Sequence, residues 1–198
     1  MPGFPPPLDD EKEQLLAFLE QQRHVLRLAA YGLTDEQARL APSVSSLSVG
    51  GLVKHVTAVE ENWCRMIQRE ARPPDAERSY DEGFGLGPGE TLAEAIRTYE
   101  ISAKATDELV RSLALETPVP VPPGVPWFPT DVDAWTVRWV VLHLIEETAR
   151  HAGHADIVRE SVDGATWAPL LSAAEDWDLR PYVEPWQPPL TGAGPSAA

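Results

Sequence analysis

The chain has 198 residues, enough for one domain with its own hydrophobic core. It carries 16 Lys and Arg residues against 31 Asp and Glu residues, a formal net charge of −15. This balance argues against nucleic acid and anionic membranes as partners, because both are bound through clustered basic side chains. No apolar run approaches the roughly 20 residues that are needed to span a bilayer. With 43% hydrophobic residues, the chain is expected to fold rather than remain disordered.

The first residues and the cysteine content indicate a cellular compartment. The opening ten residues are proline-rich and acidic, without the basic and apolar segments of a secretory signal. The single cysteine, Cys64, excludes an internal disulfide and is typical of a reducing environment. A cytoplasmic protein is therefore expected.

Both ends of the chain are rich in proline. Proline at this density cannot join helical or sheet hydrogen bonding. We therefore predict extended tails over residues 1–9 and 181–198, with one helical domain over residues 10–180. Tyr182 and Trp186 are the side chains expected to lay the C-terminal tail across the body.

Hydrophobic periodicity predicts four long helices between the tails. They are expected over residues 10–32, 48–70, 91–115 and 133–162, with a further short helix over residues 169–176. Sequences of the capping-box type begin at Thr34 and at Thr91, and Gly164 suits the C-cap of the fourth long helix. Gly50 and Gly51 fall in the first turn of the second long helix, where glycine costs little or lets another backbone approach closely.

The two longest connections, residues 71–90 and 117–132, contain many prolines and glycines. Such loops often bind ligands, although a plain surface crossover fits the composition equally well. Residues 119–125 alternate valine with proline and cannot pair as a central strand. Four long helices with almost no strand signal predict an all-α bundle with Pro-rich loops and tails.

The fourth long helix carries a concentrated group of titratable side chains. His143, Glu147, His151 and His154 all fall within an arc of about 80° on one helix face. Residues four apart stand one above the other, so Glu147 and His151 can point at a single ion. His55 lies midway along the second long helix, on or beside the face that meets the bundle interior.

Two imidazoles and one carboxylate, with an open fourth position, are typical of a catalytic zinc site. Helical bundles build metal sites from inward side chains of facing helices. Two other interpretations fit the same residues. Each histidine can be a packed core residue, and Glu147 with His151 can be an ordinary i,i+4 pair on a solvated face. His143, one turn before Glu147, is a candidate to hydrogen-bond a ligand.

These segments resemble a known family. Leu-Val-Lys-His55-Val, followed about ninety residues later by His143-Leu-Ile-Glu-Glu147-Thr-Ala-Arg-His151-Ala-Gly-His154, is similar to the DinB-like (YfiT-like) superfamily. Within it, the chain resembles the actinobacterial branch of mycothiol-dependent transferases over residues 10–165. The resemblance implies a DinB-like four-helix bundle with a long crossover, commonly assembled as a homodimer.

The resemblance also implies a divalent metal on three side chains, one from the second helix and two that are four residues apart in the fourth. These positions fall on His55, Glu147 and His151. Many relatives have histidine in place of Glu147, whereas mycothiol-dependent maleylpyruvate isomerase uses glutamate there. His154 is therefore kept as a rival ligand, and zinc is expected ahead of nickel.

The implied function is a metal-dependent S-transferase or isomerase, in which the metal presents mycothiol as a thiolate to a small electrophilic substrate. Arg150, or Trp127 and Phe128 of the 117–132 loop, are candidates for holding the thiol or a hydrophobic substrate. Two alternatives remain. One is a metal-dependent hydrolase that uses metal-bound hydroxide at the same ligands. The other is a non-catalytic helical binding or scaffold protein in which the histidines only pack the bundle.

Overall fold

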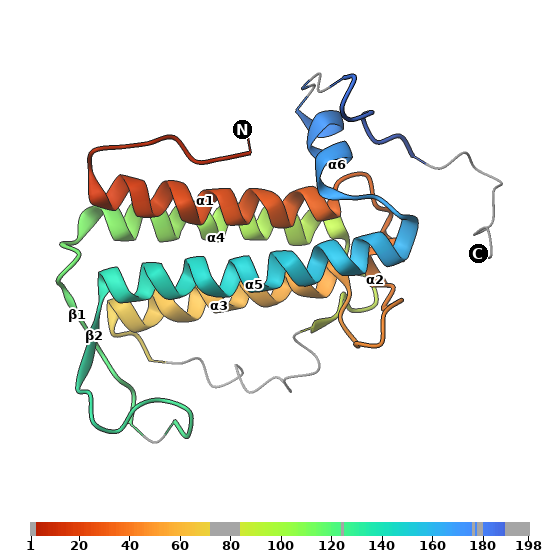
Figure 1. Ribbon diagram of the computed structural model, residues 1–198. Coiled ribbons are helices and arrows are strands. Elements are labelled where there is room, and N and C mark those ends of the chain that lie inside the picture. The colour runs from red at the N-terminus through yellow and green to blue at the C-terminus, as the bar shows by residue number, and fades with distance from the viewer. Residues whose placement is uncertain (1–2, 72–83, 124, 176, 178–179, 189–198) are drawn as a thin grey trace.

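The computed structural model of the protein describes residues 3–71, 84–123, 125–175, 177 and 180–188. Within these ranges the chain folds mainly into a bundle of long helices (Figure 1). The long helices are α1 (Glu11–Ala30), α3 (Val49–Gln68), α4 (Leu92–Ser112) and α5 (Val137–Asp163). Two short helices, α2 (Asp35–Arg39) and α6 (Trp167–Ala174), pack at one end. The predicted all-α bundle is confirmed.

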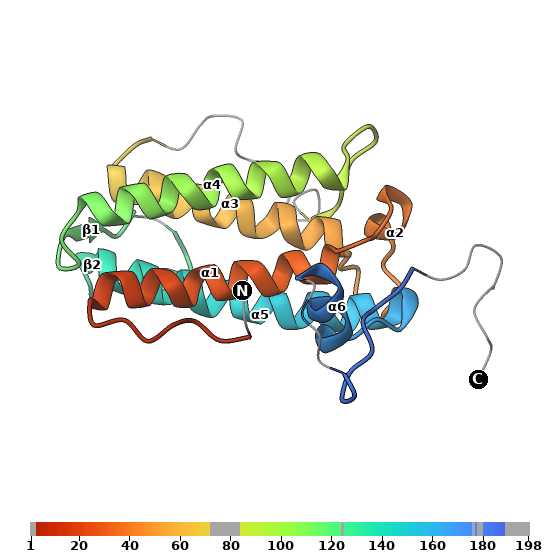
Figure 2. The ribbon, with the colours of Figure 1, turned by 90° about the horizontal axis from the view of Figure 1, so that it is seen from above.

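The order of the helices around the bundle explains how the site is assembled. α1 packs mainly against α5, and α3 packs against both α4 and α5 (Figure 2). α3 and α4 begin at the same end of the bundle (Figure 1). Of the connection between them, residues 71–90, residues 72–83 lie outside the described part, so the choice between a binding loop and a surface crossover stays open there.

Helix boundaries follow the capping signals of the sequence. The side chains of Asp10, Ser48, Thr91 and Thr136 each accept a hydrogen bond from a first-turn N–H of the following long helix. Both expected capping boxes form, at Thr34 and at Thr91. Gly164 ends α5 with a φ of 76°, a left-handed conformation that costs glycine little.

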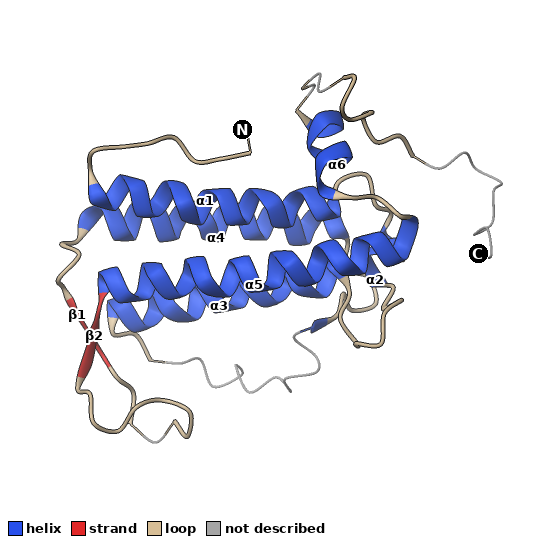
Figure 3. Ribbon diagram, in the orientation of Figure 1, coloured by secondary structure: helices blue, strands red, loops and turns tan. Residues whose placement is uncertain are grey.

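A short antiparallel ribbon, which the sequence did not predict, closes one end of the bundle (Figure 3). β1 (Pro118–Pro120) pairs with β2 (Ala134–Thr136), with Val119 opposite Trp135 and both side chains buried. Because both strands of a two-stranded ribbon are edges, proline is tolerated there. β2 also delays the start of α5 to Val137, four residues later than predicted. The ribbon holds the intervening loop beside α3 and the beginning of α5.

A buried ion-pair network joins three helices in the interior. Arg23 of α1 and Glu60 of α3 are fully buried, and two nitrogens of Arg23 donate to the two oxygens of Glu60 at 2.9 and 2.7 Å. A third nitrogen donates to Asp107 of α4 at 2.8 Å. Burial opposes the charge on Arg23, but the hydrogen bonds and charges of Glu60 and Asp107 together raise its pKa above the ordinary value.

The C-terminal segment packs on the bundle through one of the two predicted aromatic residues. The Trp186 ring lies 5.0 Å from the Arg159 guanidinium and meets Tyr31 edge-on. It also covers Gly32, where an added Cβ would lie 2.5 Å from the indole. Tyr182, in contrast, is exposed. Among the described residues, no helix combines the length and the apolar character that crossing a membrane requires.

Replacing Asp156 of α5 with asparagine is expected to stabilise the protein at neutral pH. Burial, with a smaller contribution from the Glu160 charge, raises the pKa of Asp156 to about 6. The unfolded value is about 3.9, so the folded state resists ionisation and wild-type stability falls as pH rises from about 4 to 6. Because Asp156 keeps some contact with solvent, the gain should be on the order of 1 kcal/mol.

Urea unfolding of the wild type and Asp156→Asn at pH 4 and pH 7.5 measures this effect. The variant should gain stability relative to wild type at pH 7.5, with a smaller difference at pH 4. An equal difference in unfolding free energy at pH 4 and pH 7.5 would show that ionisation of Asp156 is not the cause.

Candidate metal site

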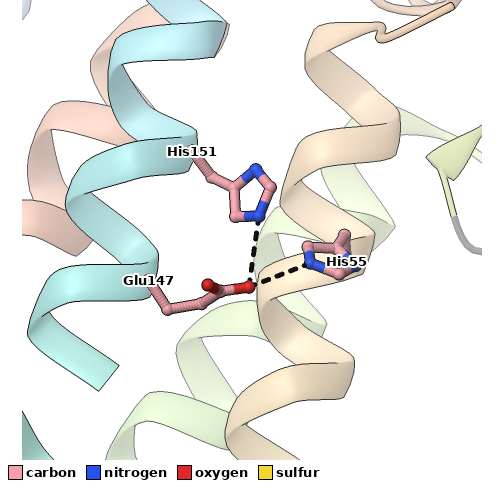
Figure 4. A group of neighbouring side chains, drawn as sticks. All are labelled: His55, Glu147 and His151. Carbon is pink, nitrogen blue, oxygen red and sulfur yellow. Dashed lines mark hydrogen bonds and ion pairs between the residues drawn. The ribbon is translucent and has the colours of Figure 1, made fainter. Parts of the chain in front are cut away.

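Three polar side chains converge between α3 and α5 (Figure 4). Glu147 Oε1 lies 3.3 Å from His55 Nε2 and 3.2 Å from His151 Nε2. One nitrogen from each histidine and one carboxylate oxygen all lie within 4.8 Å of one another. The structure therefore brings together the three residues on which the sequence analysis centred, from two helices that are ninety residues apart in the chain.

Helix geometry explains this convergence. Glu147 and His151 are four residues apart on α5 and stand one above the other on the face turned toward α3. α3 packs against α5 and presents His55 opposite them. His151 is buried, whereas His55 and Glu147 are partly exposed, so the group lies at the edge of the core with access for a small molecule.

Hydrogen bonds keep the carboxylate ionised. Hydrogen bonds from His151 and, more weakly, from His55 hold the pKa of Glu147 well below its usual range. Burial acts in the opposite direction but has a smaller effect. Glu147 therefore remains an anionic acceptor across the physiological pH range. A carboxylate oxygen between two imidazole nitrogens gives a set of donor atoms that suits a divalent cation.

The donor atoms fit zinc in type, and two of their three separations fit it in spacing. Zinc binds imidazole nitrogen and carboxylate oxygen at about 2.0–2.2 Å, so neighbouring ligands in a tetrahedral site are about 3.4 Å apart. The two Glu147–histidine separations, 3.3 and 3.2 Å, are close to this spacing. Three protein donors also leave a fourth position for a reactant, the arrangement typical of catalytic rather than structural zinc.

The other histidines of α5 lie outside this group of three. His154 Nδ1 is 3.4 Å from His151 Nδ1, the nitrogen on the opposite side of the ring from Glu147. If an ion were bound, His151 Nε2 would exchange its hydrogen bond to Glu147 for the ion and the ring proton would lie on Nδ1, facing His154, so His154 is placed to orient His151. His143 instead has its Nδ1 3.3 Å from Glu146, and Arg150 is exposed.

Phe84 stacks on the ring of His55. The two rings are stacked, with centroids 4.1 Å apart and planes 20° from parallel. Sequence reasoning missed Phe84 because it lies in an aperiodic Gly- and Pro-rich connection that gives no signal of proximity to α3. Gly50 and Gly51 make this approach feasible, since an added Cβ at Gly51 would lie 1.8 Å from the Phe84 carbonyl oxygen. Of the two reasons that the sequence offered for these glycines, the close approach of another backbone is confirmed at Gly51.

Gly51→Ala should destabilise the protein by about 1–3 kcal/mol, because the new methyl group must displace the backbone at Phe84. The matched control is Gly153→Ala in α5, where an added Cβ meets nothing within 4 Å. Removing a glycine from the interior of a helix should raise stability there by about 0.5–1 kcal/mol. Thermal or urea unfolding compares the two variants. Equal effects at both positions would refute the packing role of Gly51.

A cavity of about 1130 Å³ reaches Glu147 from the ribbon end of the bundle. Trp63 of α3, Trp127 and Phe128 of the loop between the strands, and Trp139 of α5 form part of its wall. Residues of the 117–132 loop therefore line the cavity, as expected of a binding loop. Sequence reasoning missed Trp135 and Trp139, although their four-residue spacing to His143 and Glu147 was a readable signal.

Comparisons with known proteins agree with this architecture. The sequence model of a family described as mycothiol-S-transferase matches residues 14–164. A crystal structure of a conserved protein from Enterococcus faecalis is similar in fold, with a TM-score of 0.62 at 13% sequence identity, covering 80% of this chain and 100% of that one. No curated protein matches. The resemblance noted in the sequence is confirmed, and the chain belongs to the mycothiol-S-transferase family, with a DinB-like fold.

Proposed function

We propose that the protein is a metal-dependent S-transferase that joins a small thiol, mycothiol, to an electrophilic substrate. The observation that carries this proposal is the meeting of His55, Glu147 and His151 beside a large cavity in a member of this family. An isomerase that uses the thiol as a temporary adduct would need the same site.

The residues of this chain have separate roles in the proposed reaction. His55, Glu147 and His151 would hold zinc or, as second choice, nickel. The bound ion would supply the Lewis acidity that lowers the pKa of a thiol, so that the thiol reacts as a thiolate. His154 fixes the orientation of His151, and Phe84 holds the ring of His55 in place. Their task is to keep the donor atoms in position before the reactants arrive.

The test is an assay of protein loaded with zinc, with mycothiol and an electrophile, followed by mass spectrometry of the S-conjugate. Product should form only when both the thiol and the metal are present. Turnover that persists without thiol would support the hydrolase alternative instead. Absence of both stoichiometric metal and turnover, after reconstitution with zinc and with nickel, would leave the scaffold interpretation.

A further inference from the structure

The cavity beside Glu147 is built around a row of flat rings. Trp135 of β2 and Trp139 and His143 of α5 follow one another at four-residue intervals and lie in one near-parallel stack. The Trp135–Trp139 and Trp139–His143 ring planes are each 13° apart, with centroids separated by 5.0 and 5.3 Å. The next position on this helix face is Glu147. The stack therefore leads along the cavity wall to the candidate metal site.

Trp63 of α3 fixes this row from the side. Its ring centroid lies 5.2 Å from that of Trp135, 5.5 Å from that of Trp139 and 5.0 Å from that of His143, at steep angles. Trp63 itself is buried, so the row rests on the core and cannot easily collapse into the cavity. Trp139 nevertheless keeps 40% of its surface exposed, and Trp127 at the loop keeps 80%. Exposed indole surface beside an apolar cavity favours a flat aromatic guest.

The charges around the cavity argue against an anionic guest. Among the described residues that line it, Arg65 is the one permanent cation. Its guanidinium already donates to Asn62 at 2.6 Å and lies 4.0 Å from Glu61. Glu70 adds negative charge to the lining, as does Glu147 in the metal-free protein. In that state a carboxylate or sulfonate would be repelled where a neutral ring would not.

We infer that this cavity binds a neutral, planar aromatic electrophile, with its ring against Trp139 and its reactive carbon toward Glu147. The inference deepens the proposed function and rests on it for the identity of the reaction. In the transfer, the thiol sulfur would form one bond to carbon and the bond to a leaving group such as chloride would break. Chloride would depart with the electron pair, and the thiol proton would pass to solvent.

Binding can be tested without metal or thiol, by using fluorescent probes that share one ring system. N-phenyl-1-naphthylamine is neutral, and 8-anilinonaphthalene-1-sulfonate carries the same rings with a sulfonate. Metal-free wild-type protein should bind the neutral probe at least about tenfold more tightly than the anionic one. Equal or tighter binding of the sulfonate, or no binding of the neutral probe, would overturn the inference.

Variants locate the bound ring. Trp139→Ala should weaken binding of the neutral probe by about tenfold, a size typical of one lost stacking partner. The control is Trp167→Ala in α6, because Trp167 is 38% exposed, almost as much as Trp139, and lies outside the cavity lining. Trp139→Phe should retain most of the affinity and guards against a general loss of folding. Equal losses in the alanine variants of Trp139 and Trp167 would contradict the site.

These measurements are independent of metal binding. If the protein takes up no metal but binds the neutral probe at Trp139, the proposed function fails and the cavity assignment stands. If the metal-loaded protein turns over the thiol but does not bind the neutral probe, the proposed function stands and the cavity assignment fails.

Discussion

Replacing His151 with alanine is expected to abolish stoichiometric binding of a divalent metal. The change removes one of three donors and leaves Glu147 with only His55, 3.3 Å away, on the opposite helix. Loss of an outer-shell partner alone costs 10- to 100-fold in metal affinity, so loss of a donor should weaken zinc binding by more than about 100-fold. Competition with a chromophoric chelator, together with elemental analysis of the purified protein, measures the change. Thiol transfer should fall with it.

His24→Ala is the matched control for this experiment. His24 is a partly buried histidine of α1 whose Nε2 lies 2.8 Å from Glu175, away from the three converging residues. Its replacement should leave zinc affinity unchanged within about twofold. Retained stoichiometric zinc in His151→Ala, with only a change in stability, would favour the scaffold interpretation. Circular dichroism of both variants shows whether the bundle remains folded.

Replacing Glu60 with alanine is expected to lower the free energy of unfolding by about 3–5 kcal/mol. Arg23 and Glu60 are both fully buried and share two hydrogen bonds. Without the Glu60 carboxylate, the Arg23 guanidinium keeps one short contact to Asp107 and a second, 3.6 Å contact to Glu20. A buried cation that loses its main partner cannot recover that energy from water.

The neighbouring Glu61→Ala is the control, because its side chain is 44% exposed and pairs with Arg65 only at 4.0 Å. Its effect should stay below about 0.5 kcal/mol. Urea unfolding at pH 7 compares the two variants with wild type. A loss below about 1 kcal/mol in Glu60→Ala would show that the network contributes little beyond packing.

Local features of the chain were readable from the sequence because they depend on neighbours in the chain. Ser48, Thr91 and Gly164 mark helix ends through contacts within about one turn, and the structure confirms them. The i,i+4 relation of Glu147 and His151 is equally local, since the helix period alone places both on one face. The ribbon was missed because its pairing joins residues 14 to 18 apart in the chain, and a proline-rich strand carries no periodic signal of its own.

Whether Glu147 or His154 joins His55 and His151 could not be decided from sequence. His143, His151 and His154 share the helix face of Glu147, so spacing left all of them available. The rotation of α5 against α3 turns Glu147 and His151 toward His55. His154 instead contacts Nδ1 of His151, on the side of the ring away from Glu147. That rotation is set by packing of the whole core.

The sequence by itself determined an acidic, all-α bundle, most of its helix caps and the candidate residues for binding an ion, because propensity, capping and periodicity act over a few residues. Only the tertiary structure decided which residues meet. It placed Phe84 on His55, paired Arg23 with Glu60, and set a row of indoles beside Glu147. Contacts of this kind depend on the relative rotation and spacing of helices, which emerge when all the apolar faces are buried together.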